Sequence, residues 1–150
     1  MALWQFDLFL VPRLGSAPTL GVDGWVLPLV PEPAASSARE LLSSWLGEPW
    51  LMCEDIAVFG AETGNRIDIS SGEAGGAEIF ARIDARAESL KFCRLLHELV
   101  SGIDCRLFSP EFGGEVGTRA EDLLEALMRS RAWRYALSPA DTLRRLADGH

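Results

Sequence analysis

The chain lacks the motifs of several common kinds of enzyme and cofactor site. It has no Gly-x-Ser-x-Gly nucleophile elbow, no P-loop and no Gly-x-Gly-x-x-Gly dinucleotide fingerprint. Gly72, Gly75 and Gly76 fall in a predicted hairpin turn, whereas a phosphate-binding loop joins a strand to a helix. No cluster of His, Cys and Asp has the spacing of metal ligands. The sequence therefore predicts neither a cofactor nor a metal site.

Cysteine is scarce as well. The three residues, Cys53, Cys93 and Cys105, are odd in number and contain no Cys-x-x-Cys pair. This pattern fits neither a disulfide framework nor a zinc site. Each cysteine has apolar neighbours, so we expect buried, reduced thiols, which are typical of a reducing compartment.

Basic residues are outnumbered by acidic ones. The 14 Lys and Arg and the 22 Asp and Glu give a formal net charge of -8. A net negative charge repels phosphate groups, and no basic stripe offsets it here. The composition therefore disfavours binding to nucleic acid or to an anionic membrane, and suits a basic partner.

Long apolar runs are also missing. No segment approaches the roughly 20 residues that a membrane-spanning helix needs. The apolar N-terminus lacks a positively charged start and is interrupted by Gln5 and Asp7, which argues against a signal peptide. Residues 4–11 alternate in character and predict a strand. Together with the reduced thiols, these features predict a cytoplasmic protein.

The composition of the 150 residues is that of a globular protein, with 48% hydrophobic and 24% charged residues. We expect one domain over residues 1–150. Residues 12–35 are rich in Pro and Gly, which predicts a long connection with at most one short strand near Trp25. Trp25, Trp45 and Trp50 lie near this connection and the short helix after it, which predicts one cluster, either a small core that holds the connection or a candidate pocket.

Helix signals recur along the chain. The capping box from Ser37 to Glu40 predicts a helix that ends at Gly47. An apolar stripe predicts a helix over residues 88–101, ended by Gly102, and residues 104–108 predict a strand. A second capping box, from Thr118 to Glu121, opens another helix. Ser138 and Pro139 begin a last helix that ends near residue 147, and the segment around residue 133 has no assignment.

Residues 55–86 read as three short alternating strands joined by tight turns, which predicts an antiparallel meander. With helices packed on one face, the fold class is α+β, a two-layer sandwich. A four-residue loop places Val58 opposite Ile67 and Gly64 in the left-handed position. Charge pairing then selects the second register, with Asp68 opposite Arg82 and Arg66 opposite Asp84.

The polar face of this meander is the main candidate site, because Arg and aromatic side chains are enriched in protein interfaces. Its alternative is a solvated face held by ion pairs. The candidate interaction face consists of Phe59, Arg66, Asp68, Phe80, Arg82, Asp84 and Arg86. We expect a non-enzymatic interaction module that binds a protein partner or a second copy of itself. Small size, acidity and an exposed sheet face are shared by many bacterial immunity or antitoxin-like inhibitors, an analogy of class only.

A small enzyme or ligand-binding domain is the second hypothesis, with its site at the tryptophans or at the sheet-face carboxylates. Asp7 joins Asp68 and Asp84 if the first strand pairs nearby. The interleaved arginines are expected to hold these carboxylates ionised, which disfavours catalysis. Cys93 and His97 lie four residues apart on one helix, but within its apolar stripe, where an unreactive thiol is expected.

Overall fold

The computed structural model describes residues 2–72, 75–87 and 89–148. The helices are α1 (Glu32–Leu46), α2 (Leu90–Gly102), α3 (Ala120–Arg129), α4 (Arg131–Leu137) and α5 (Pro139–Ala147). The strands are β1 (Gln5–Pro12), β2 (Thr19–Gly21), β3 (Gly24–Val26), β4 (Val30–Pro31), β5 (Trp50–Cys53), β6 (Ile56–Gly60), β7 (Arg66–Ser71), β8 (Gly76–Asp84), β9 (Cys105–Ser109) and β10 (Gly114–Val116). Glu73, in the predicted hairpin turn, and Glu88, the predicted first residue of a helix, lie outside the described residues.

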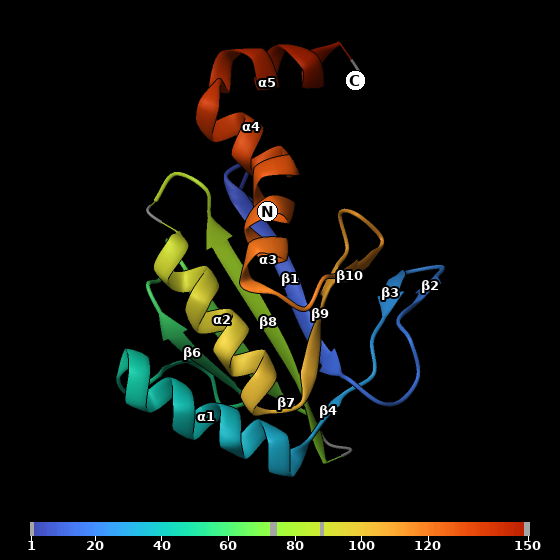
Figure 1. The fold of residues 1–150 in the computed structure, drawn as a ribbon, viewed down its shortest axis with the longest axis vertical. Helices are drawn as coiled ribbons and strands as arrows, with labels where there is room; N and C mark the ends of the chain where they lie inside the picture. The colour runs from blue at the N-terminus through green and yellow to red at the C-terminus, as the bar shows by residue number, and fades with distance from the viewer. Residues whose placement is uncertain (1, 73–74, 88, 149–150) are drawn as a thin grey trace.

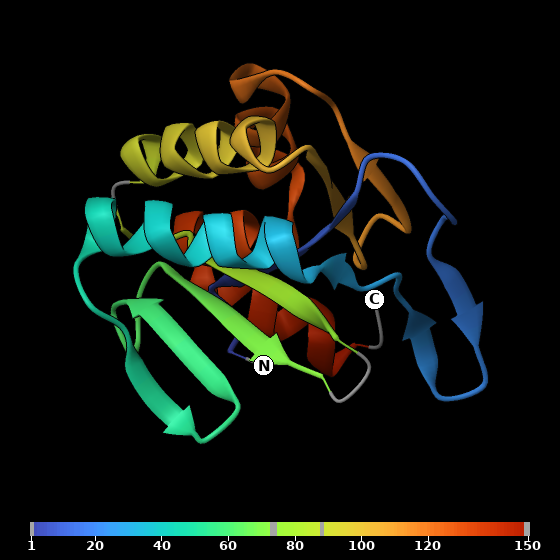
Figure 2. The same ribbon diagram turned by 90° about the horizontal axis from the view of Figure 1, so that it is seen from below.

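An eight-stranded antiparallel sheet forms one layer and confirms the α+β fold class. Seven strands follow the order β10-β9-β1-β8-β7-β6-β5, and β4 pairs with one end of β8. The N-terminal strand β1 therefore lies in the middle of the sheet, between β8 and β9. Strands β2 and β3 form a separate hairpin that projects from one side (Figures 1 and 2).

The helices α1 and α2 lie side by side on one face of the sheet (Figure 2). Alternate residues of β1 point toward them, and Phe6, Leu8 and Leu10 are buried in the core. The apolar stripe of α2 meets this layer through Phe92 and Leu96, among others. Helix α3 adds Leu123 and Leu127 to the same core, and α4 and α5 continue beyond it (Figure 1).

The loop between β6 and β7 is one residue longer than predicted, because Ala61 donates its backbone N–H to the carbonyl of Asn65. Gly60, at φ 107°, takes the left-handed conformation expected of Gly64. This single added residue changes the side of the sheet on which each β6 residue lies. Phe59, predicted on the exposed face, is 1% exposed and packs in the core, where it pairs with Ile67.

The register between β7 and β8 differs from the predicted one by two residues. Arg66 lies opposite Arg82, and Asp68 lies opposite Phe80. The predicted pairs Asp68–Arg82 and Arg66–Asp84 are therefore wrong. A shift of two keeps every side chain on its predicted face, so the apolar pattern alone does not distinguish the two registers.

Helix α1 begins five residues before the predicted capping box. Pro33 falls in its first turn, where a missing N–H costs no hydrogen bond. Ser37 is therefore inside the helix, and its hydroxyl donates to the carbonyl of Pro33 at 3.1 Å. Gly47 ends the helix as predicted. The connection before α1 consequently runs only to residue 31 and contains three short strands.

The remaining helices follow the sequence signals within a few residues. The N-cap of α3 is Arg119, whose backbone N–H donates to the carboxylate of Asp122, one residue after the predicted box. Helix α2 continues through Gly102, and Asp104 at φ 55° provides the left-handed turn after it. Helix α5 confirms the predicted start at Pro139. Helix α4 occupies the segment without an assignment.

Cys93 and Cys105 are buried as predicted, whereas Cys53 is exposed on strand β5. That strand has no counterpart among the predicted elements. Within residues 2–72, 75–87 and 89–148, none of the helices combines the length and apolar character needed to cross a membrane.

Candidate functional site

The face of the sheet turned away from α1 and α2, here called the outer face, carries the polar and aromatic side chains of four neighbouring strands. It consists of Gln5, Asp7 and Phe9 on β1, Arg66 and Asp68 on β7, Phe80 and Arg82 on β8, and Arg106 and Phe108 on β9. Directly opposite residues of antiparallel strands share a face, so these side chains line up in rows across the sheet.

The first row is polar and runs Arg66, Arg82, Asp7 across β7, β8 and β1. The like charges of Arg66 and Arg82 are each offset by a carboxylate. Arg66 donates from Nη2 to Asp68 Oδ2 at 3.2 Å, and from Nη1 to the carbonyl of Glu62 at 3.0 Å. Arg82 Nε lies 3.6 Å from Asp7 Oδ1. The offsetting carboxylate for Arg82 thus comes from a third strand.

Four polar atoms in and beside this row are buried and make no hydrogen bond to another described residue. Asp7 Oδ1 and Arg82 Nε face each other at 3.6 Å, and the other two are Arg66 Nε and Asp68 Oδ1. Buried polar atoms in proteins normally have at least one partner. The row is therefore held by ion pairs and is largely withdrawn from water.

Burial raises the pKa of both Asp7 and Asp68 above the ordinary value, and it is the largest cause for each. Arg82 lowers the pKa of Asp7, and Arg66 lowers that of Asp68, but neither cancels the effect of burial. Burial thus has a larger effect than the arginines on the pKa of these two carboxyl groups, because the three-strand packing removes water from them.

The second row is aromatic. Phe80, Phe9 and Phe108 lie in succession across β8, β1 and β9. The Phe9 and Phe80 ring centroids are 4.9 Å apart, and Arg82 lies over the Phe80 ring at 4.9 Å. Phe108 is covered edge-on by Trp25, whose ring centroid is 4.8 Å away. The β2–β3 hairpin therefore closes one end of this row.

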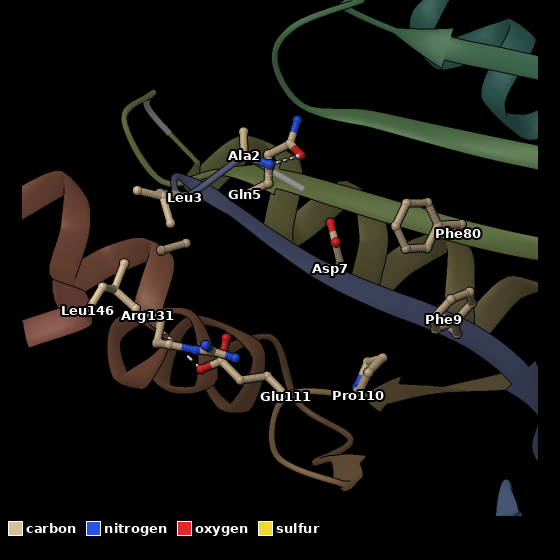
Figure 3. Close-up of a pocket in the computed structure, with 11 residues that line it drawn as sticks. Ala2, Leu3, Gln5, Asp7, Phe9, Phe80, Pro110, Glu111, Arg131 and Leu146 are labelled. Carbon is tan, nitrogen blue, oxygen red and sulfur yellow. Dashed lines mark hydrogen bonds between the residues drawn. The ribbon is translucent and has the colours of Figure 1, made fainter. Parts of the chain in front are cut away.

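The uncovered part of both rows lines a cavity of about 540 Å³ (Figure 3). Asp7, Phe9 and Phe80 form its sheet side. Leu3, just before β1, and Leu146 of α5 also line the cavity, and Glu111 accepts a hydrogen bond from the backbone N–H of Arg131 at 3.0 Å (Figure 3). A cavity of this size with few polar groups is in the range of ligand and side-chain binding sites.

Two predicted members of the interaction face form a separate cluster at the end of β8. Asp84 is 5% exposed, and its carboxylate accepts hydrogen bonds from the backbone N–H and the guanidinium of Arg86. Arg86 lies over the Trp4 ring at 3.8 Å. With Phe59 in the core, Arg66, Asp68, Phe80 and Arg82 of the predicted set meet in the two rows. Asp84 lies opposite Gln5 on the same face, at the end of β8.

The three tryptophans predicted to cluster lie on three different elements, β3, α1 and β5. Trp25 packs on Phe108 of β9, and lines a smaller cavity of about 280 Å³. Trp50 lies on β5, at the other end of the strand order. Trp45 is exposed at the end of α1. The predicted common pocket is therefore wrong.

Cys93 lies on the buried side of α2, within the apolar stripe, as predicted. His97 of the same helix is only half-buried and lines a second cavity, of about 410 Å³. Cys105 borders that cavity, and burial raises the pKa of its thiol to about 11. Among the described residues, no group of three or more His, Cys, Asp or Glu is placed to hold a metal ion.

Sequence reasoning missed Phe9, Arg106 and Phe108, and anticipated Asp7 only conditionally. The signal was present, because Gln5, Asp7 and Phe9 alternate with the buried residues of β1. Their place beside β8 depends on which strands pair, and the local pattern does not contain that information. Comparison of the chain with protein-family models, curated proteins and solved structures found no match.

Proposed function

We propose that this chain is a non-enzymatic interaction module whose outer face binds a protein partner or a second copy of the chain. The observation that carries the proposal is the ion-paired row from Arg66 to Asp7 beside the half-buried rings of Phe9 and Phe80, all on one face of the sheet. A partner that covers these rings removes their remaining apolar surface from water.

The residue types support the same function. Arginine and aromatic side chains are enriched at the centres of protein interfaces, where they are surrounded by contacts that exclude water. The mutual ion pairs of Arg82 with Asp7 and of Arg66 with Asp68 hold the face in one geometry. Such a face suits an inhibitor-like protein or a subunit of a larger assembly, and we place that role in the cytoplasm.

An affinity pull-down from the organism that encodes the chain tests the proposal. Bait proteins are the unmodified chain, Phe80→Ala and Arg82→Glu, with Arg94→Glu as the matched control because Arg94 is exposed on α2, on the other side of the sheet. We expect the two outer-face variants to lose a partner that the control retains, while circular dichroism shows an unchanged fold. Equal capture by all four baits contradicts the proposal.

Self-association through the same face is measured separately. Sedimentation velocity of the unmodified chain and of Phe80→Ala distinguishes a dimer that uses this face from a monomer. A dimer that both proteins form equally well contradicts a role of the outer face in self-association.

Ligand binding is the second candidate function, supported by the cavity in which Asp7 and Gln5 lie among apolar residues. Phe9→Trp fills part of this space. A small molecule that shifts the melting temperature of the unmodified chain, but not that of Phe9→Trp, supports this alternative. A fragment screen without such a compound counts against it.

A further inference from the structure

The segment between Arg39 and Arg66 is the most one-sidedly charged part of the chain. Its residues 40–65 contain five acidic side chains and no Lys or Arg, against a net charge of -8 for the whole protein. This segment includes the end of α1 and the β5–β6 hairpin. Glu54 and Asp55 form the turn of the hairpin, and Glu48 lies just before β5, so acidic residues stand at both ends of that strand.

Strand β5 is the last strand of the sheet on this side. In the part of the chain that the structure describes, no strand pairs with its outer edge. Alternate residues of such an edge direct N–H and C=O groups away from the sheet, where a further strand can bind them. The edge also exposes Leu51 at 65%, Met52 at 48% and Cys53.

The usual protections of an edge strand are only partly present on β5. The strand is short, and its register with β6 shifts between Leu51 and Cys53. However, it carries no Lys, and its exposed apolar side chains Leu51 and Met52 differ from the charged side chains that normally prevent pairing. The acidic residues Glu48, Glu54 and Asp55 lie at its two ends and are all exposed.

The opposite edge of the sheet lacks this combination. Strand β10 has three residues, and its Glu115 faces Arg106 at 3.5 Å. Of the two end strands of the eight-stranded sheet, β5 is therefore the one with an apolar edge and acidic ends.

We infer that β5 is a docking edge for an extended, apolar segment of a protein partner that carries Lys or Arg at its ends. The main chain of that segment adds a strand beside β5, and its basic ends meet the exposed carboxylates.

A second copy of this chain is a poor occupant. In antiparallel pairing of two β5 strands about Leu51 and Met52, Glu48 lies opposite Asp55 of the other copy, and the like charges repel.

The test uses the full-length protein and a synthetic peptide of alternating Val and Thr with Lys at both ends. Methylation of alternate backbone nitrogens leaves the peptide one pairing edge, which keeps it from self-aggregating. Two control peptides are used, one with Glu in place of Lys and one methylated on both edges. Binding is followed by NMR shifts and by amide hydrogen exchange at residues 50–53.

We expect the Lys peptide to slow exchange of β5 amides and to bind at least about fivefold more tightly than the Glu peptide, since several exposed ion pairs are involved. The doubly methylated peptide should not bind. Equal binding of the Lys and Glu peptides, binding of the doubly methylated peptide, or no binding of any peptide overturns the proposal.

A charge-reversed protein provides the matched control. Glu54→Lys with Asp55→Lys should reverse the preference toward the Glu peptide, while Glu98→Lys, an exposed change on α2, should leave it unaltered. A dimer of the unmodified chain that breaks on Met52→Pro identifies a second copy as the occupant and overturns the basic partner. The peptide test concerns β5 alone. If the outer face binds no partner in the pull-down, the results expected for β5 do not change.

Discussion

Arg66 and Arg82 lie directly opposite each other on β7 and β8, on the same face of the sheet. Like charges at directly opposite positions are destabilising. They are tolerated here because Asp68 lies two residues along β7 from Arg66, and Asp7 lies opposite Arg82 on β1. The charge balance of the outer face therefore depends on three strands at once.

The first prediction concerns this three-strand balance. Asp7→Asn leaves Arg82 facing Arg66 without the nearest carboxylate, which removes an ion pair worth about 1 kcal/mol at neutral pH but also relieves the cost of burying the ionised carboxylate. In an Arg82→Leu background the same change should cost less, because the repulsion is gone. A double-mutant cycle by urea denaturation measures this coupling, and additive effects of the two changes argue against it.

The second prediction concerns pH. Because the pKa of Asp68 is raised in the folded protein, its carboxylate binds a proton at a higher pH there than in the unfolded chain. Stability therefore rises as the pH falls from neutral toward the ordinary value of 3.8, because the folded state then holds more protons. Asp68→Asn lacks this gain. Urea midpoints should shift in favour of the unmodified chain on acidification, and a shift the other way contradicts the burial of Asp68.

The third prediction separates the two faces of the sheet. Phe59 is buried in the core, so Phe59→Ala should cost about 3–5 kcal/mol. Phe80 is only half-buried and packs mainly on Phe9, so Phe80→Ala should cost about 1–2 kcal/mol. Chemical denaturation of both variants checks the order. If both variants lose a similar free energy of unfolding, the two rings are equally buried and the prediction is wrong.

The fourth prediction concerns the turn after β6. A Cβ at Gly60 would lie 2.5 Å from the carbonyl oxygen of Asn65, with φ at 107°. Gly47 also has a positive φ, but nothing lies within 4 Å of its added Cβ. Gly60→Ala should therefore be less stable than Gly47→Ala by at least about 1 kcal/mol. Equal melting temperatures would contradict the five-residue loop.

The fifth prediction concerns thiol reactivity. Cys53 is exposed, whereas Cys105 is buried with a pKa of about 11 instead of 9.0, which lowers its thiolate fraction about a hundredfold. A thiol reagent should modify Cys53 first in the native protein, and all three cysteines after denaturation. Peptide mapping by mass spectrometry identifies the site. Early modification of Cys105 would contradict the structure.

The sequence by itself determined the elements whose signals are local. Neighbouring residues specify the alternation in β1 and the apolar stripe of α2, so both could be predicted. The same holds for the end of α1 at Gly47 and the start of α5 at Pro139. The α+β class followed from those elements. The start of α1 was not readable in this way, because Pro33 is compatible both with a loop and with a first helical turn.

Only the tertiary structure decided which residues meet on the outer face. A period-two pattern is unchanged by a shift of two residues, so it permits both registers of β7 against β8, and the charge that favours the observed one belongs to Asp7, far away in sequence. One extra residue in the loop after Gly60 moved Phe59 into the core. Strand pairing and loop length are properties of the whole sheet, and they turned a list of candidate residues into a specific surface.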